Sequence, residues 1–292
     1  MRQLERSRQR GSAAVAGQHV MRPMPVRPER SEARRVRRVE RAPLAVPARG
    51  REEGMSDAFE LQRGLLPHVP LQRGALRISG DVLGSRRTSG DHFDVLEGAG
   101  GRTSIFVVDV AGHGLSAALI GNAAREALRV SLRGGASLED AAAALESCLE
   151  AHGDIRRATA AFALLRFSSD ASLVEVINAG LPPVTLVRDG RTLATVASRS
   201  MPAGFAPGAH HPCDVLRVPE GGVVIVASDG ATSGALDGWG MAALSATLLR
   251  ELPDPAGATS EALRDAIRTH LGSYGALEDD ATVVIASRAE LG

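Results

Sequence analysis

The sequence of 292 residues predicts an α+β layered fold with antiparallel sheets. Short runs of β-branched and apolar residues recur along the chain, which is typical of strands. The helical patterns come in pairs between groups of strands, without the regular strand–helix alternation of a parallel sheet. A third observation is the Asp189-Gly190 pair between two apolar runs, which predicts a tight type I′ hairpin turn.

The elements follow in order from residue 59. An amphipathic turn over residues 59–66 ends at Pro67, and a strand is expected after Asp91. Helices are predicted over residues 115–130, 138–151, 241–252 and 261–271, the second capped by Ser137 in a capping box and the last by Ser260. The other predicted strands cover residues 76–78, 104–110, 159–167, 173–178, 184–187, 192–196, 215–218, 223–227 and 282–286.

The first 55 residues differ in composition from the rest of the chain. They hold 14 arginines against 6 acidic residues, are rich in proline and show no sustained period, so we expect a disordered tail. A short basic helix, a nucleic-acid or lipid contact, and a true translation start near Met55 are the alternatives. The predicted organisation is a tail over residues 1–55, a linker helix region over 56–75 and a folded domain over 76–290.

Composition restricts the function of the folded part. Residues 56–292 carry 20 arginines and 28 acidic residues, and the sequence contains no lysine, so a general nucleic-acid-binding surface is not expected there. No apolar stretch approaches the ~20 residues that span a bilayer, and the N-terminus lacks the apolar segment of a secretion signal. We therefore expect a cytoplasmic protein without a membrane anchor.

Acidic residues stand at the ends of several predicted core strands. They are Asp91, Asp109, Asp229 and the pair Asp279-Asp280. A carboxylate at the end of a buried strand is costly unless an arginine or a metal ion pairs with it. One such residue is usually a turn former or a cap, whereas four separate sites favour a hard cation such as Mg²⁺ or Mn²⁺. The spacing alone leaves both interpretations open.

Four motifs in this order resemble those of the metal-dependent PPM (type-2C) protein phosphatases. They read SGDHFD, VVDVAGHG, ASDGAT and DDATVVI, and they are similar to the GGDxYD, GDVxGHG, TDGxTE and DDxT series of the bacterial SpoIIE/RsbU-like branch. LQRGLLP, NAGLPPVTLVRDG and MPAGFAPG resemble further segments of that branch. The resemblance covers roughly residues 60–288.

The resemblance implies a four-layer α-β-β-α sandwich of two antiparallel sheets flanked by helix pairs. It further implies two Mg²⁺ or Mn²⁺ ions that activate water for attack on a phosphoserine or phosphothreonine. By motif, the ligands would be Asp91, Asp109, the Val110 carbonyl, Asp229 and Asp279, and Asp280 would orient a ligand or substitute for one. In some type-2C relatives an arginine five residues before the first metal aspartate holds the substrate phosphate, which corresponds to Arg86 here. The alternative is that Arg86 and Arg87 form a solvated surface pair.

The motifs also depart from the pattern of the family. Leu181 stands where the branch often has histidine, and Ser233 stands where glutamate is common. In type-2C enzymes that use a histidine as general acid, this histidine lies two residues after the metal aspartate. His113 lies four residues after Asp109, so we expect it to stand at the entry to a helix and not to act as a general acid. We expect His210 and His211 to lie in a solvent-exposed turn.

The resemblance therefore predicts a protein serine/threonine phosphatase whose substrate is an anti-anti-sigma factor in partner-switching control of sigma factors. No sensor domain is recognisable in the sequence, so activation would come from a partner protein or from the short N-terminal region. The alternative is a pseudophosphatase that binds a partner without catalysis, which Leu181 and Ser233 keep open. A nucleic-acid binder that acts through residues 1–55 is a third possibility.

Overall fold

The computed structural model describes residues 60–84, 88–152, 158–206, 208–232, 238–272 and 279–289. Contacts within the chain divide it into two units, residues 1–45 and 46–292, and all the described residues belong to the second unit. The predicted tail over residues 1–55 and the phosphate-binding candidate Arg86 lie outside the described residues.

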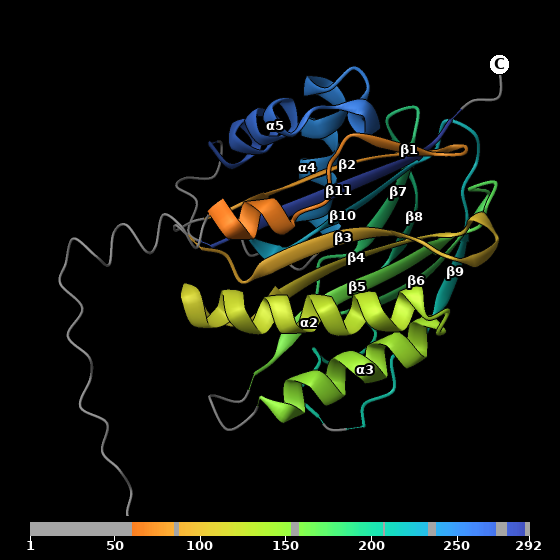
Figure 1. Cartoon of the computed structure of the whole chain (residues 1–292). Helices are drawn as coiled ribbons and strands as arrows, with labels where there is room; N and C mark the ends of the chain where they lie inside the picture. The colour runs from red at the N-terminus through yellow and green to blue at the C-terminus, as the bar shows by residue number, and fades with distance from the viewer. Residues whose placement is uncertain are drawn as a thin grey trace, which may run out of the picture. The chain divides into compact units, whose positions relative to one another are not determined.

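Two antiparallel sheets form the centre of this unit (Figure 1). The first has the order β1 (Leu71–Arg73), β2 (Leu76–Leu83), β11 (Ala281–Arg288), β10 (Val223–Ala227), β7 (Val184–Arg188) and β8 (Arg191–Val196). The second has the order β3 (Asp91–Glu97), β4 (Thr103–Val110), β5 (Ala160–Phe167), β6 (Leu173–Ala179) and β9 (Asp214–Arg217). Every neighbouring pair of strands in both sheets is antiparallel, as the sequence predicted.

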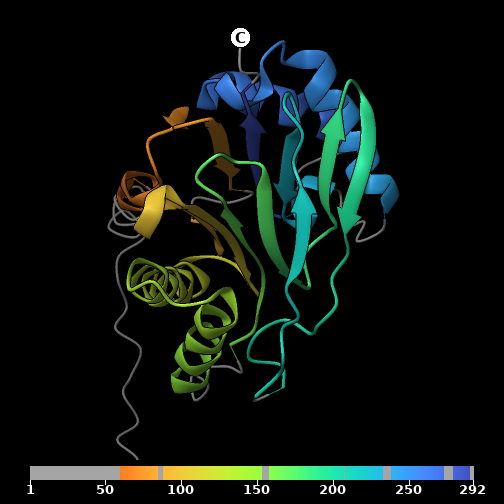
Figure 2. The same cartoon turned by 90° about the vertical axis from the view of Figure 1, so that its right-hand side faces the viewer.

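A pair of helices packs on the outer face of each sheet (Figure 2). Helices α2 (Leu115–Arg133) and α3 (Leu138–Ala151) cover the five-stranded sheet, and α4 (Gly238–Glu251) and α5 (Ser260–Gly272) cover the six-stranded sheet. Short 3-10 turns occupy Ala99–Gly101, Asp229–Thr232 and Pro255–Gly257. The predicted four-layer α-β-β-α sandwich is confirmed.

The layering explains why β4 is apolar almost throughout. Its side chains alternate between two cores: Ile105 and Val107 face the other sheet, while Phe106 and Val108 face α2 and α3. Because successive side chains of a strand point to opposite faces, a strand buried on both faces needs apolar residues at every position. Asp109 is the position where this continuous run stops.

Local sequence signals place most of the turns and caps correctly. Asp189 and Gly190 have positive φ values of 50° and 71°, as a type I′ turn requires. Ser137 caps α3, since its Oγ accepts a hydrogen bond of 3.0 Å from the Asp140 amide. The predicted cap of α5 is wrong by one residue. The Thr259 Oγ1 accepts from the Ala262 amide at 3.2 Å, and Ser260 is already the first helical residue.

The loop between β8 and β9 is fastened to α3 by a buried histidine. The His211 Nε2 lies 3.0 Å from Glu146 Oε1, and its Nδ1 lies 2.8 Å from the Ser200 hydroxyl. His211 is buried, so the expectation of a solvent-exposed turn is wrong for this residue, whereas His210 is exposed. Sequence could not reveal this, because Glu146 precedes His211 by 65 residues.

Candidate metal centre

Asp91 and Asp109 lie opposite each other at one end of the five-stranded sheet. Asp91 opens β3, Asp109 is the second-last residue of β4, and the antiparallel register pairs the two. The Val110 carbonyl comes so close to Gly90 that a Cβ there would lie 2.7 Å from its oxygen. Glycine at position 90 therefore lets two aspartates and a carbonyl approach one another.

Asp229 and Asp279 come from the other sheet. Asp229 begins the 3-10 turn after β10, and Asp279 and Asp280 precede β11, the antiparallel neighbour of β10. The backbone of Gly230 packs directly on the carbonyl of Asp280, since a Cβ on this glycine would lie only 2.1 Å from that oxygen. A glycine after Asp229 is therefore a steric requirement for this approach.

Two hydrogen bonds join the sheets at this place. The Thr282 hydroxyl of β11 donates to Asp91 Oδ2 at 2.7 Å, and the Gly90 amide donates to Asp280 Oδ2 at 3.0 Å. All four of these residues are buried. Asp280 thus holds the turn before Asp91, whereas Asp279 is exposed and its Oδ1 accepts a hydrogen bond of 2.8 Å from the Asp280 amide.

The carboxylates raise one another's pKa values. Burial and the charge of Asp229, with a further contribution from Asp279, raise the pKa of Asp109 from 3.8 to about 7. Burial and the charge of Asp109 hold the pKa of Asp91 well above its usual value, although the Thr282 and Ser228 hydroxyls act in the opposite direction. Burial and the charge of Asp279 raise the pKa of Asp229. Within the part of the chain that the structure describes, none of these four carboxylates has an arginine as an ion-pair partner.

The donor set fits a divalent cation. Mg²⁺ and Mn²⁺ take oxygen ligands, and four carboxylates with a carbonyl provide only oxygen. In addition, Asp229 Oδ1 is buried and accepts no hydrogen bond within the described residues, so this oxygen is available to bind a cation. Among the described residues, no three potential ligand side chains converge closely enough to form a complete cation site in this structure.

Asp94 has a different partner. Arg125 Nη2 of α2 lies 2.9 Å from its Oδ2, and Arg129 of the same helix donates to the same oxygen. Asp94 pairs with arginines that bind α2 to β3, whereas Asp91, three residues earlier in the same strand, faces other carboxylates.

The remaining predicted positions are distributed as follows. Leu181 is buried in the core between the sheets, so its side chain contributes to packing. His113 is exposed just before α2, as expected. Arg86 and Ser233 lie outside the described residues.

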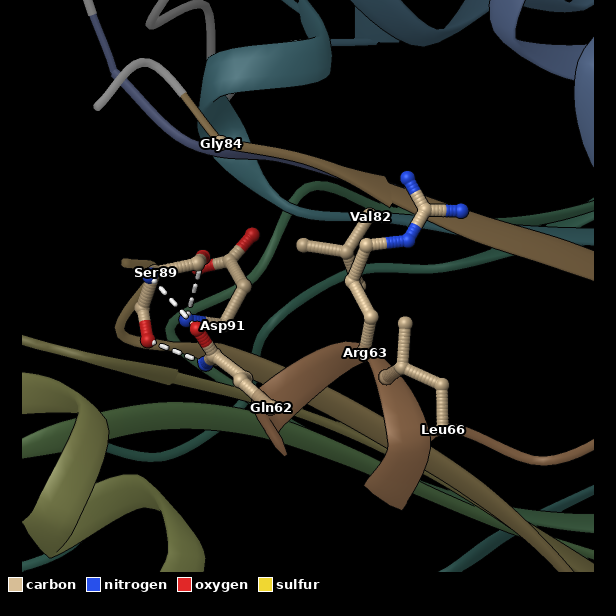
Figure 3. Close-up of a pocket in the computed structure, with 7 residues that line it drawn as sticks. All are labelled: Gln62, Arg63, Leu66, Val82, Gly84, Ser89 and Asp91. Atoms are coloured by element: carbon tan, nitrogen blue, oxygen red, sulfur yellow. Dashed lines mark hydrogen bonds between the residues drawn. The ribbon is translucent and has the colours of Figure 1, made fainter. Parts of the chain in front are cut away.

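The sequence reasoning missed a contribution from the helical turn over residues 60–65. Gln62 and Arg63 line a small pocket together with Ser89 and Asp91 (Figure 3). The signal was present in LQRGLLP, which was interpreted only as a linker.

Comparison with known proteins identifies the family. The sequence model of "Stage II sporulation protein E (SpoIIE)" matches residues 99–289, which is more than half of the chain. The chain belongs to the SpoIIE family. Comparison with curated proteins gives no match.

Solved structures share the fold of this SpoIIE-family chain. The RsbU and RsbW domains of Rv1364c from Mycobacterium tuberculosis are 24% identical with a TM-score of 0.64, and the match covers 78% of this chain and 63% of that one. The SiaA-PP2C domain of Pseudomonas aeruginosa is 18% identical with a TM-score of 0.66, covering 83% of this chain and 98% of that one. The catalytic domain of the serine/threonine phosphatase PstP, solved with two manganese ions, is 16% identical with a TM-score of 0.55, covering 74% and 99%. The SpoIIE-family chain thus has a PP2C-type phosphatase fold.

No helix among the described residues of this SpoIIE-family chain is long and apolar enough to span a bilayer.

Proposed function

We propose that this chain is a metal-dependent protein phosphatase that hydrolyses phosphoserine or phosphothreonine on a regulatory protein in the cytoplasm. The observation that carries the proposal is the pairing of Asp91 with Asp109 across β3 and β4, next to Asp229 and Asp279 from the other sheet. Family membership and the manganese ions of the PstP relative support the same activity.

The proposed ligands are Asp91, Asp109, Asp229, Asp279 and the Val110 carbonyl. Two bound Mg²⁺ or Mn²⁺ ions would lower the pKa of water and neutralise the charge of the phosphate. The chain itself contributes the orientation of these oxygens. Thr282 fixes the rotamer of Asp91, and Asp280 fixes the backbone of Gly90. We assign Asp280 to this orienting role because its Oδ2 is already engaged by an amide.

The proposed substrate is an anti-anti-sigma factor phosphorylated on serine or threonine. The relative from Mycobacterium tuberculosis, in which an RsbU and an RsbW domain were solved together, supports a role in partner switching. The described surface gives no reason to propose nucleic acid as a partner of the folded domain. An activating protein is part of the same proposal.

The test is hydrolysis of a serine-phosphorylated anti-anti-sigma protein from the same genome by the full chain, with Mn²⁺ and with EDTA. We expect turnover with Mn²⁺ and none after chelation. The matched variants are Asp229→Asn, which removes a proposed ligand, and Asp265→Asn, which changes an exposed residue of α5. Turnover that persists after thorough chelation would contradict the metal mechanism. Mn²⁺ binding without turnover on any phosphoprotein would favour the pseudophosphatase instead.

A further inference from the structure

The helical turn over residues 60–65 makes direct contact with the turn that presents Asp91. The Gln62 Nε2 donates to the Ser89 carbonyl at 2.6 Å, and the Ser89 amide donates to Gln62 Oε1 at 2.9 Å (Figure 3). One side-chain amide therefore satisfies both backbone groups of a single residue, as a neighbouring strand would. Gln62 precedes Ser89 by 27 residues, so this pairing is a tertiary contact.

Ser89 in turn bonds to the backbone of Asp91. Its hydroxyl accepts a hydrogen bond of 3.0 Å from the Asp91 amide, and Ser89 is 4% exposed. The next residue, Gly90, is held from the other sheet by Asp280. The backbone of residues 89–91 is thus fixed from two sides, by Gln62 and by Asp280. Removing either contact leaves buried backbone groups without partners, which is costly.

The helical turn has a second anchor on α2. Arg125 Nη2 donates to the Leu65 carbonyl at 2.6 Å, and the same arginine pairs with Asp94 of β3. So short a helical segment is not stable alone, and Leu61, 72% exposed, buries little of its side chain. Leu66, directly after the segment, packs against the core between the sheets, and the polar contacts add to this anchor. Of these polar contacts, the Gln62 pair is the one that reaches the candidate metal centre.

We propose that Gln62 is a positioning residue for the metal centre, which it serves by holding the Ser89–Asp91 turn in the conformation that binds divalent cations. This inference rests on the metal site of the proposed function. Residues that orient metal ligands typically contribute 10–100-fold to metal affinity. Thermodynamic linkage adds a consequence: a cation that binds the ordered turn must strengthen the docking of residues 60–65 by the same factor.

The experiment measures Mn²⁺ binding to the full chain by calorimetry, together with amide hydrogen exchange of peptides that cover residues 88–96. Gln62→Ala removes both hydrogen bonds to Ser89 and the 3.4 Å contact between Gln62 Nε2 and His92 Nε2, and Gln62→Met removes them while it keeps the length of the side chain. Gln72→Ala is the matched control, because the exposed side chain of Gln72 donates to the nearby Gly74 carbonyl, in the turn after β1. We expect both Gln62 variants to bind Mn²⁺ about tenfold more weakly. Their residues 88–96 should also exchange faster, and Gln72→Ala should match the wild type in both measurements.

Turnover separates positioning from a general loss of structure. If Gln62 acts through the Ser89–Asp91 turn, saturating Mn²⁺ restores the kcat of Gln62→Met to nearly the wild-type value. Unchanged Mn²⁺ affinity in both variants would overturn the inference, as would a wild-type chain that binds no Mn²⁺. A wild-type chain that binds Mn²⁺ in a Gln62-dependent way but hydrolyses no phosphoprotein would refute the proposed function and support this inference.

Discussion

Replacement of Asp109 by asparagine tests the metal centre most directly. Asparagine keeps the volume of aspartate and removes its charge from a group of neighbouring carboxylates. In the absence of metal, we expect Asp109→Asn to stabilise the protein at pH 8, because repulsion with Asp229 and Asp279 disappears. With Mn²⁺, this advantage shrinks, because the wild type is stabilised by the ion and the variant has lost a ligand.

The magnitude follows from the pKa of Asp109. Its pKa is about 7 in the folded state, against 3.8 for an isolated aspartate. The folded state therefore binds this proton more tightly, and wild-type stability is lost as the pH rises from about 4 to about 7. Each pKa unit corresponds to about 1.4 kcal/mol, so the loss is at most about 4 kcal/mol, less to the extent that water and neighbouring carboxylates screen it. Asparagine does not titrate and escapes this loss.

The assay is urea and thermal unfolding of the full chain at pH 4 to 8, in EDTA and in Mn²⁺. In EDTA, we expect the stability advantage of Asp109→Asn to grow from near zero at pH 4 to its maximum above pH 7. For a chain of this size, about 1 kcal/mol shifts Tm by ~2–4 °C, so the difference at pH 8 is several degrees. In Mn²⁺ at about 100 times its Kd, the wild type should gain about 2.7 kcal/mol, and the variant should gain little.

Two results would refute this reasoning. One is an apo Asp109→Asn variant that is less stable than the wild type at pH 8, which would mean that Asp109 is a structural cap or turn former. The other is an unchanged stabilisation by Mn²⁺, which would exclude Asp109 as a ligand. Asp265→Asn, the same substitution on the exposed face of α5, should change neither measurement.

Three further predictions concern the scaffold. Deletion of residues 1–54 should leave Tm and Mn²⁺-dependent turnover nearly unchanged, because the two sheets and their helices are complete without them; a protein that unfolds would contradict the proposed domain boundary. Arg125→Met should lower the free energy of unfolding in urea by about 3 kcal/mol, because it removes one of the two arginines that pair with the buried Asp94. A loss below about 1 kcal/mol would show that Arg129 alone is enough to neutralise Asp94. Gly121→Ala should destabilise by about 1–3 kcal/mol in the same assay, since its Cβ would lie 2.4 Å from the His92 ring, and a neutral result would mean that the ring moves freely.

Local physics explains what the sequence determined by itself. The apolar run of β4, the Asp189-Gly190 turn and the Ser137 cap each depend on residues within one element or one turn, and all were predicted. The fold class follows from these elements, because antiparallel strands joined by short turns and flanked by helix pairs have few ways to bury both faces. The proposed ligands Asp91, Asp109, Asp229 and Asp279 were identified by motif before any geometry was known.

Only the tertiary structure decided which partner each polar group has. Asp91 and Asp94 stand three residues apart in one strand, yet the first faces the carboxylates of two sheets and the second faces arginines of α2. Gln62 contacts the candidate site through Ser89, 27 residues away, and the buried His211 pairs with Glu146, 65 residues away. A residue type sets what a side chain can bind, whereas its neighbours are fixed by the packing of sheets and helices distant in sequence. The periodicity and spacing of the sequence therefore do not predict which residues this packing brings together.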